Sequence, residues 1–250
     1  MDFARELADQ AAQIGLSIFA GDVRVAIKAD NTPVTQADTS IEAMIRRRVA
    51  ERFPHDHVLG EEEGGDADTS GRLWIVDPID ATANFARAIP IWATLIALQL
   101  GGETVLAIAE APAMGERYEA VNGQGATLNG APIKVSETDH IPDAQILYAG
   151  LGAWLTEPSG KGVLSVLADA KRVRGFGDFW GHVLVARGAA EAMAEPSLAL
   201  WDYAAPTLIV EEAGGRVTTM DGAPLHHGGS VLSSNGAIHD ELLRRFADDT

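Results

Sequence analysis

The chain contains no cysteine among its 250 residues, and it is poor in basic residues. The first absence excludes disulfide bonds, thiolate metal sites and cysteine nucleophiles. Nineteen Lys and Arg residues stand against 36 Asp and Glu residues, which gives a formal net charge of −17. Such an acidic surface repels nucleic acids and anionic membranes. We attribute most of this charge to solubility, and a smaller part to a carboxylate cluster that holds a cation.

Long apolar runs are also missing. The longest one, Ile89 to Leu100, is too short to span a bilayer. The first twenty residues carry several charged side chains among the apolar ones, which is not the pattern of a signal peptide. We therefore expect a cytoplasmic protein whose partner is a small molecule.

Hydrophobic periodicity predicts an α/β protein rather than a bundle or a sandwich. Helical spacing extends over residues 2–20 and from Thr35, where Thr35 and Asp38 form a capping pair. Further helices are predicted at 161–170 and at 179–189, and two more begin near Asp202 and near Ala237. Strand patterns cover residues 73–76, 91–100, 104–109, 116–121, 216–219 and 231–234. A boundary between two closely packed halves is expected near residues 139–143, so the halves are 1–140 and 141–250.

Three acidic segments are the candidates for chemistry. They are Gly60-Glu61-Glu62-Glu63-Gly64, Trp74-Ile75-Val76-Asp77-Pro78-Ile79-Asp80-Ala81-Thr82, and Trp201-Asp202-Tyr203. In the second, an apolar strand leads into Asp77, Pro78 is expected to end the strand, and Asp80 is placed at the start of a short helix. A strand end followed by a helix start suits cations and phosphates.

Each carboxylate alone is most simply a helix cap or a solvated loop residue. Taken together, Glu61, Asp77, Asp80 and Asp202 would repel one another and demand bound cations. Because this set contains no His or Cys, Mg2+ is favoured over Zn2+. His226-His227 is a further possible metal site, although a solvated loop is the simpler interpretation. The Asp-x-Asp spacing of aspartyl-phosphate phosphatases is absent, and so is a Gly-x-Ser-x-Gly elbow.

With these three segments in this order, the sequence resembles the inositol monophosphatase superfamily from about Lys28 to Asp240. The resemblance implies a layered α/β/α/β/α sugar-phosphatase fold, a homodimer, and a Mg2+-dependent phosphoric monoester hydrolase with two or three ions per site. The first half would carry most of the metal ligands, and the second would complete the site. The implied ligands are Glu61, Asp77, the Ile79 carbonyl, Asp80 and Asp202.

The same resemblance assigns catalytic and phosphate-binding roles. Thr82, with Glu61, would orient the attacking water, and Asp38 would pair with Thr82. Backbone N–H groups of Ala81 and Thr82 would bind the phosphate, and Glu62 would assist from outside the ligand set.

Two alanines depart from the family pattern. Ala81 stands in the usual position of a glycine in Asp-Pro-Ile-Asp-Gly-Thr, and Ala88 also replaces a frequent glycine. Glycine permits positive φ and close approach to a ligand, so Ala81 is expected to lower catalytic efficiency. Replacing Ala81 by glycine is expected to cost about 0.5–1 kcal/mol of stability through the unfolded chain.

The segment before Asp202 is expected to select the substrate. Asp178 and Glu195 are candidate substrate-binding residues, and Gly177-Asp178 is similar to the histidinol-phosphate phosphatase branch. An Asp and a Glu would complement the ammonium and imidazole of L-histidinol phosphate, an intermediate of histidine biosynthesis. An alternative is that Asp178 only caps its helix. Inositol-1-phosphate or another sugar phosphate remains an alternative substrate. A non-catalytic metal- and phosphate-binding protein is the alternative of another class.

Overall fold

A computed structural model describes residues 1–28, 32–65, 71–156 and 160–247 of the chain. The larger of its two main sheets has seven strands in the order β3-β4-β5-β6-β7-β8-β9. Strand β3 pairs with β4 in parallel, and every later pair in this sheet is antiparallel. The strands are β3 (His57–Gly60), β4 (Arg72–Asp80), β5 (Ala93–Leu100), β6 (Glu103–Ala111), β7 (Glu116–Val121), β8 (Ala126–Leu128) and β9 (Ala131–Pro132).

The second sheet has five strands in the order β11-β10-β12-β14-β13. Its strands are β10 (Gln145–Tyr148), β11 (Arg172–Arg174), β12 (Ala192–Leu198), β13 (Arg216–Thr218) and β14 (Gly229–Ser234). A small hairpin is formed by β1 (Val25–Ile27) and β2 (Pro33–Thr35).

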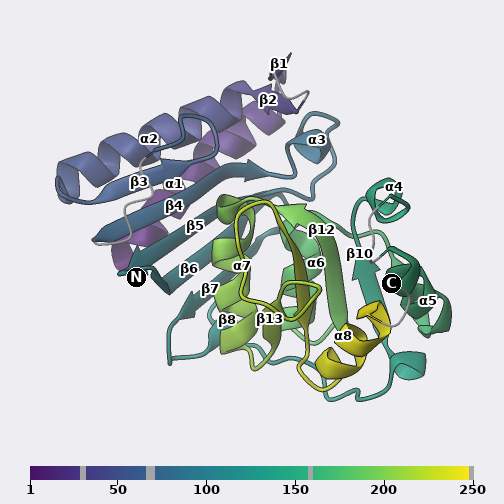
Figure 1. Ribbon diagram of the computed structural model, residues 1–250. Coiled ribbons are helices and arrows are strands. Elements are labelled where there is room, and N and C mark those ends of the chain that lie inside the picture. Colours follow the sequence, from purple (N-terminus) through teal and green to yellow (C-terminus); the bar gives the residue numbers. More distant parts are fainter. Residues whose placement is uncertain (29–31, 66–70, 157–159, 248–250) are drawn as a thin grey trace.

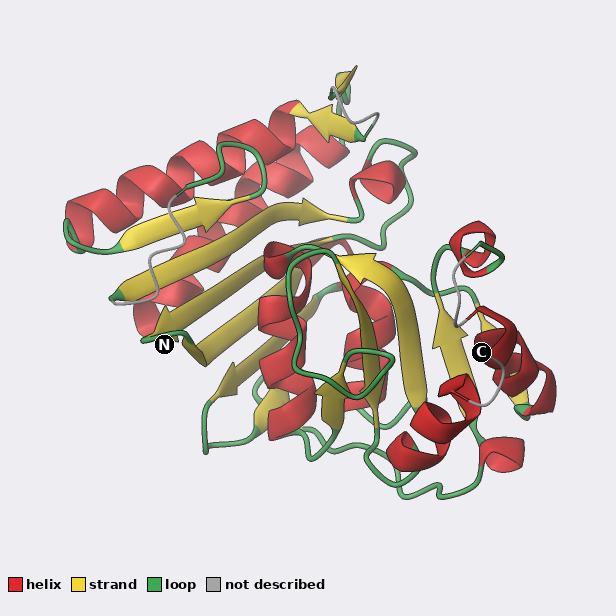
Figure 2. Ribbon diagram, in the orientation of Figure 1, coloured by secondary structure: helices red, strands yellow, loops and turns green. Residues whose placement is uncertain are grey.

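Helices lie on both outer faces and between the sheets (Figures 1 and 2). Helices α1 (Asp2–Phe19) and α2 (Gln36–Arg52) cover one face of the larger sheet, while α6 (Asp178–Ala186) and α7 (Leu200–Glu212) lie between the two sheets. Helices α5 (Gly160–Asp169) and α8 (His239–Ala247) cover the outer face of the second sheet. The short helices are α3 (Thr82–Phe85) and α4 (Leu151–Trp154). This is the predicted α/β/α/β/α order.

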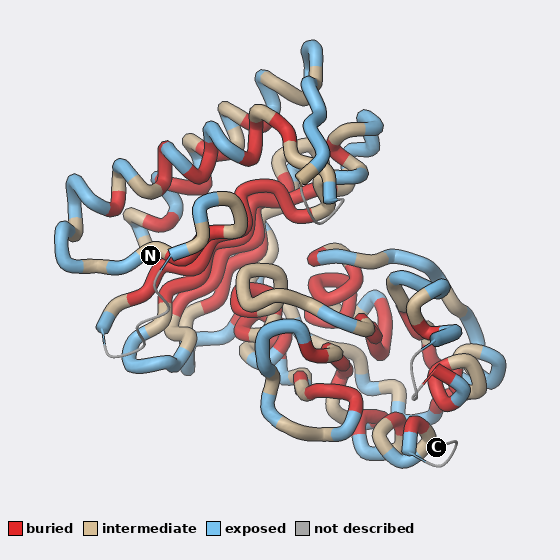
Figure 3. The backbone as a smooth tube through the Cα atoms, turned by 45° about the horizontal axis from the view of Figure 1, so that its top comes forward, coloured by how far each residue is buried: buried red, intermediate tan, exposed pale blue. Residues whose placement is uncertain are grey.

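The strand periodicity explains how one sheet serves two cores. Alternate residues of a strand point to opposite faces. Trp74 and Val76 accordingly pack into the cluster under α1 and α2, while Leu73 and Ile75 pack toward α6 and α7. Both sets are buried, and Figure 3 shows the central strands as the most continuously buried part of the chain. A sheet covered on both sides gives a rigid frame for the residues at its strand ends.

The helix predicted from Thr35 begins there as expected. Thr35 is its N-cap, and the capping box with Asp38 is present in full. The predicted helix near Ala237 begins instead at His239, and the strand predicted from Ile91 begins at Ala93. No helix among the described residues combines the length and the apolar character needed to cross a membrane. The division into halves 1–140 and 141–250 stays a prediction.

Candidate active site

Six carboxylates gather in two neighbouring groups. In the first, ligand atoms of Asp77, Asp80 and Asp202 all lie within 4.8 Å of one another. In the second, Asp38, Glu61 and Glu62 meet the same limit. Burial raises the pKa of Asp77 and of Asp202, and the charge of Glu61 raises both further, as expected for two adjoining groups. The fold therefore brings together acidic residues from segments far apart in the sequence.

A bulge in β4 places Asp77 and Asp80 on the same side. We expected Pro78 to end the strand and Asp80 to lie at the start of a short helix. The first expectation was wrong, and Asp80 is instead the last residue of the strand, two residues before α3 begins at Thr82. Strand β4 continues to Asp80, and its register with β5 shifts between Asp77 and Asp80. Residues three apart in a regular strand point to opposite faces. One extra residue in β4 between Asp77 and Asp80 brings both side chains to the same face. The Thr94 hydroxyl donates a hydrogen bond to the Pro78 carbonyl at 2.8 Å, so this carbonyl is satisfied within the bulge.

Asp202 joins them from the first turn of α7. Its carboxylate accepts a hydrogen bond from the backbone N–H of Ala199, the residue that precedes the helix, at 2.7 Å. A carboxylate in this position is stabilised by the free N–H groups of the helix start. Asp80 acts similarly on another helix, because its Oδ2 accepts from the N–H of Phe179 in α6 at 2.9 Å. Both carboxylates are thus fixed by helices that lie between the sheets.

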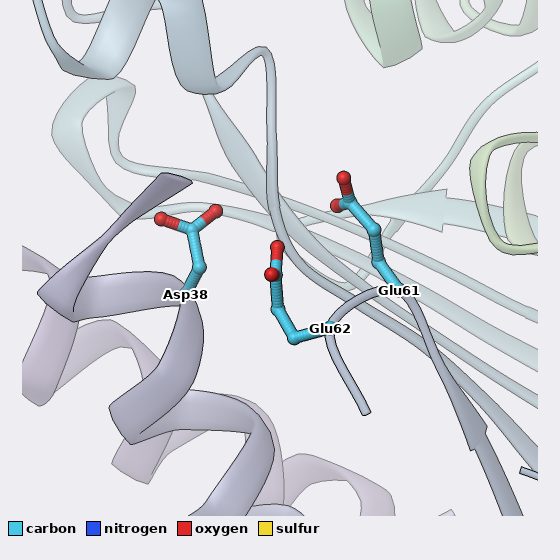
Figure 4. A group of neighbouring side chains, drawn as sticks. All are labelled: Asp38, Glu61 and Glu62. Atoms are coloured by element: carbon cyan, nitrogen blue, oxygen red, sulfur yellow. The ribbon is translucent and has the colours of Figure 1, made fainter. Parts of the chain in front are cut away.

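The second group lies where α2 meets the turn that follows β3. Figure 4 shows Asp38 on helix α2 and Glu61 and Glu62 on the turn. Lys28 Nζ contacts both glutamates, at 2.8 Å from Glu61 Oε1 and 2.6 Å from Glu62 Oε1. Burial alone would lower the pKa of Lys28, but these two hydrogen bonds raise it above its usual value. Lys28 could not be assigned to the site from the sequence, since an isolated lysine has no characteristic spacing.

Thr82 connects the two groups. Its hydroxyl lies 2.9 Å from the carbonyl of Ile79 and 3.3 Å from Asp38 Oδ1. The buried Asp38 carboxylate also accepts hydrogen bonds from the N–H and the hydroxyl of Thr35, at 2.8 Å and 2.5 Å. The capping box of α2 thus fixes one oxygen of Asp38 and leaves the other for Thr82.

Ala81 lies between Asp80 and Thr82 in the left-handed region, with φ 66° and ψ 45°. Ala88 has a positive φ as well, at 56°. This region is disfavoured for residues with a Cβ and is readily adopted by glycine. The backbone therefore retains the conformation that glycine would take, and both alanines carry its strain.

The first group has the electrostatics of a cation site. Burial, followed by repulsion from neighbouring carboxylates, raises the pKa of Asp77 and of Asp80 well above the usual value. Burial likewise raises the pKa of Asp202 to about 7. Asp77 Oδ1 is buried and has no hydrogen-bond partner among the residues that the structure describes. A divalent cation would neutralise this repulsion and satisfy that oxygen, and an all-oxygen donor set suits Mg2+.

Asp178 and Glu195 extend the acidic region beyond this group. Asp178 has φ 58° and is an exposed residue, although partial burial of its carboxyl raises the pKa of that group. Its N–H donates to the buried Glu195 carboxylate at 2.9 Å. Burial, with the charge of Asp178 next, raises the pKa of Glu195 to about 8. Asp178 also contributes to the raised pKa of Asp80. The N-cap of α6 is Gly177 and has no side-chain cap bond, so Asp178 does not cap the helix.

His226 and His227, which we considered as a metal site, have other contacts. His227 Nδ1 accepts a hydrogen bond from the N–H of Leu200, the first residue of α7, at 3.2 Å. Its ring meets Trp201 edge to face. Neither histidine is in the acidic groups found among the described residues. His227 therefore supports the helix that carries Asp202.

Comparison with known proteins agrees with this geometry. Residues 1–249 match the model of the inositol monophosphatase family. The chain belongs to this family. This match confirms the family resemblance that we inferred from the three acidic segments.

Individual relatives cover nearly the whole chain. A histidinol-phosphatase of Mycobacterium tuberculosis is 41% identical over 249 residues, which is 97% of this chain and 96% of that protein. A histidinol-phosphatase of Streptomyces coelicolor is 42% identical over 250 residues, with 96% and 94% covered. The solved inositol monophosphatase of Anabaena superposes with a TM-score of 0.86 at 28% identity, over 100% of this chain and 96% of that one. The predicted fold class is confirmed as well.

Proposed function

We propose that this member of the family is a Mg2+-dependent phosphomonoesterase that hydrolyses L-histidinol phosphate to L-histidinol and phosphate. One observation carries the proposal: a second acidic pair, Asp178 and Glu195, adjoins the group of Asp77, Asp80 and Asp202. A phosphate ester held at the three aspartates would place its alcohol portion beside Asp178 and Glu195. The identity to two histidinol-phosphatases supports the same substrate.

The metal would be held by carboxylates and one carbonyl. We assign Glu61, Asp77, Asp80, Asp202 and the carbonyl of Ile79 as its ligands, with two or three Mg2+ ions per site. When bound, Mg2+ activates water and stabilises the charge that develops on the phosphoryl group and the leaving oxygen. Asp77, Asp80 and Asp202 would release protons on binding it, because burial raises the pKa of each in the protein alone.

The remaining residues would orient the water and the phosphate. Donation from Thr82 Oγ1 to Asp38 Oδ1 leaves the hydroxyl lone pairs free to accept a hydrogen bond from the attacking water. Glu61 would accept the second hydrogen of that water. The backbone N–H groups of Ala81 and Thr82, where α3 begins, would donate to phosphate oxygens.

Charge complementarity would select the alcohol. Histidinol phosphate brings an ammonium and an imidazole, whereas a polyol brings no charge. The exposed Asp178 can meet one cationic group directly. An arriving cation would also favour the ionised form of Glu195, whose pKa of about 8 keeps it largely protonated at neutral pH. The pair therefore provides negative charge where a cationic substrate needs it.

The test is phosphate release from a panel of monoesters with Mg2+ and with EDTA. Histidinol phosphate should be hydrolysed with the highest kcat/KM, and EDTA should abolish the activity. Asp178→Asn should lower kcat/KM for histidinol phosphate by roughly ten- to a hundredfold, as expected for a lost charge-assisted hydrogen bond. Hydrolysis of glycerol 2-phosphate should barely change.

Asn tolerates the positive φ at this position, so the melting temperature should stay near that of the wild type. Asp240→Asn is the matched control, since Asp240 lies in the first turn of α8 and pairs with Arg216 away from the site. An unchanged ratio of the two substrates in Asp178→Asn would contradict the assignment of Asp178.

A second candidate is hydrolysis of inositol-1-phosphate or another sugar phosphate, favoured by the likeness to the Anabaena inositol monophosphatase. The same panel distinguishes it. Absence of phosphate release from every ester would instead favour a non-catalytic binding protein. We further propose that the protein is a cytoplasmic homodimer. Light scattering after size-exclusion chromatography tests the oligomeric state.

A further inference from the structure

A partly buried ion pair lies beneath the turn that carries Glu61 and Glu62. Glu42, on α2, is 0% exposed, and it belongs to neither carboxylate group. Arg46, one helical turn later, donates to Glu42 Oε1 from Nε at 2.9 Å and from Nη2 at 2.7 Å. Burying such a pair is unfavourable unless further hydrogen bonds satisfy both partners. In this protein those further bonds all go to the strand and turn that lead to the site.

Glu42 binds the middle of the turn and Arg46 binds both ends. The backbone N–H of Glu62 donates to Glu42 Oε2 at 2.8 Å, and that of Glu63 donates to Oε1 at 3.0 Å. Arg46 Nη1 donates to the carbonyl of Val58 at 3.1 Å, and Nη2 donates to the carbonyl of Gly64. Two side chains thus fix four backbone groups of residues 58–64.

Gly60 makes this approach possible. A Cβ at this position would lie 2.3 Å from Glu42 Cδ and equally close to Oε1. The carboxylate cannot yield easily, because hydrogen bonds from Arg46, Glu62 and Glu63 hold it in place. The glycine of the Gly-Glu-Glu turn is therefore required by the buried carboxylate beside it.

We propose that Glu42 and Arg46 form a clamp that positions Glu61 and Glu62 for metal binding, an inference that rests on the proposed function. Both glutamates have carboxylate oxygens within 4.8 Å of Asp38. Lys28 offsets part of the repulsion among these carboxylates, and the remainder favours movement of the turn away from the site. Backbone hydrogen bonds to a buried side chain oppose that movement. Glu42 is a positioning residue: it acts through the turn and not on the substrate.

The clamp is tested by Glu42→Gln. Glutamine keeps the shape of the side chain, but it replaces one acceptor oxygen with an amide NH2 group that faces N–H donors. The Mg2+ concentration for half-maximal activity should rise roughly ten- to a hundredfold, the range typical of residues that orient metal ligands. Independently of activity, the Mg2+ affinity measured by calorimetry should fall by a similar factor.

Glu119→Gln is the matched control. Glu119 on β7 is also buried and accepts from Nε and Nη2 of Arg5, each at 2.8 Å, but it lies outside both carboxylate groups. This variant should lose stability while its Mg2+ affinity stays that of the wild type.

Gly60→Ala provides a second route, because it displaces the Glu42 carboxylate without changing its charge. It should weaken Mg2+ binding in the same direction, and it keeps the test valid if Glu42→Gln does not fold. Wild-type Mg2+ affinity in a folded Glu42→Gln or Gly60→Ala variant would overturn the clamp. A wild-type protein that binds Mg2+ but hydrolyses no ester would contradict the proposed function alone.

Discussion

The carboxylates that we assign to the metal should destabilise the metal-free protein, and Asp202→Asn should reveal this. The pKa of Asp202 rises from 3.8 to about 7 in the folded protein, chiefly through burial. A carboxyl group with a raised folded pKa holds its proton longer in the folded state than in the unfolded chain. Stability is therefore lost as pH rises above 3.8, and the loss is complete above about 7.

The magnitude follows from the two pKa values. Full ionisation of Asp202 costs on the order of 4 kcal/mol, of which about 2 kcal/mol accumulates between pH 5.5 and pH 8. Asn carries no charge and can still accept the hydrogen bond from Ala199. In EDTA, Asp202→Asn should thus raise the free energy of unfolding, and by more at pH 8 than at pH 5.5. Its turnover with Mg2+ should fall by at least ~10²-fold.

The assay is thermal and urea unfolding of both proteins at the two pH values, with EDTA and with Mg2+. Mg2+ should stabilise the wild type more than the variant. Asp240 is exposed and pairs with Arg216, so Asp240→Asn should show no gain in the free energy of unfolding in EDTA. A lower melting temperature of Asp202→Asn at pH 8 without metal would refute the reasoning, because it would mean that the charge is already compensated by the protein.

Two further predictions concern Ala81 and lithium. Ala81→Gly should raise catalytic efficiency if the methyl group crowds the phosphate, and steady-state kinetics measures this; an unchanged or lower kcat/KM would show that the backbone has adapted to alanine. Its melting temperature should rise by about 1–2 °C rather than fall, because relief of about 1–2 kcal/mol of left-handed strain exceeds the entropic cost of glycine, which is about 0.5–1 kcal/mol. LiCl should inhibit hydrolysis more than matched NaCl, as the family resemblance implies; equal responses would count against that expectation.

Local chemistry explains why some features could be predicted without a structure. The capping box of Thr35 and Asp38 depends on residues three apart, and the strand predicted at residues 73–76 depends on a short apolar run. The three acidic segments likewise stood out, because carboxylates next to a buried strand or a helix start are specific in combination. These features depend on neighbours along the chain.

Pro78 shows where such reasoning fails. Its missing N–H predicts the end of a strand, but the strand tolerates it at a bulge, where β4 has one residue more than β5. Only the pairing with β5 decides between these outcomes. The conformation of Ala81 is similar, since alanine by itself favours negative φ and the surrounding fold holds it at 66°.

Short-range patterns along the chain were sufficient to predict the succession of buried strands and amphipathic helices, the capping of α2, and the oxygen-rich character of the site. Packing in three dimensions was needed to show which carboxylates meet, that Lys28 contacts Glu61 and Glu62, and that Glu42 and Arg46 hold the turn in place. The reason is physical. Periodicity and capping are short-range properties of the chain, whereas distances between residues 42, 77 and 202 depend on how sheets and helices pack.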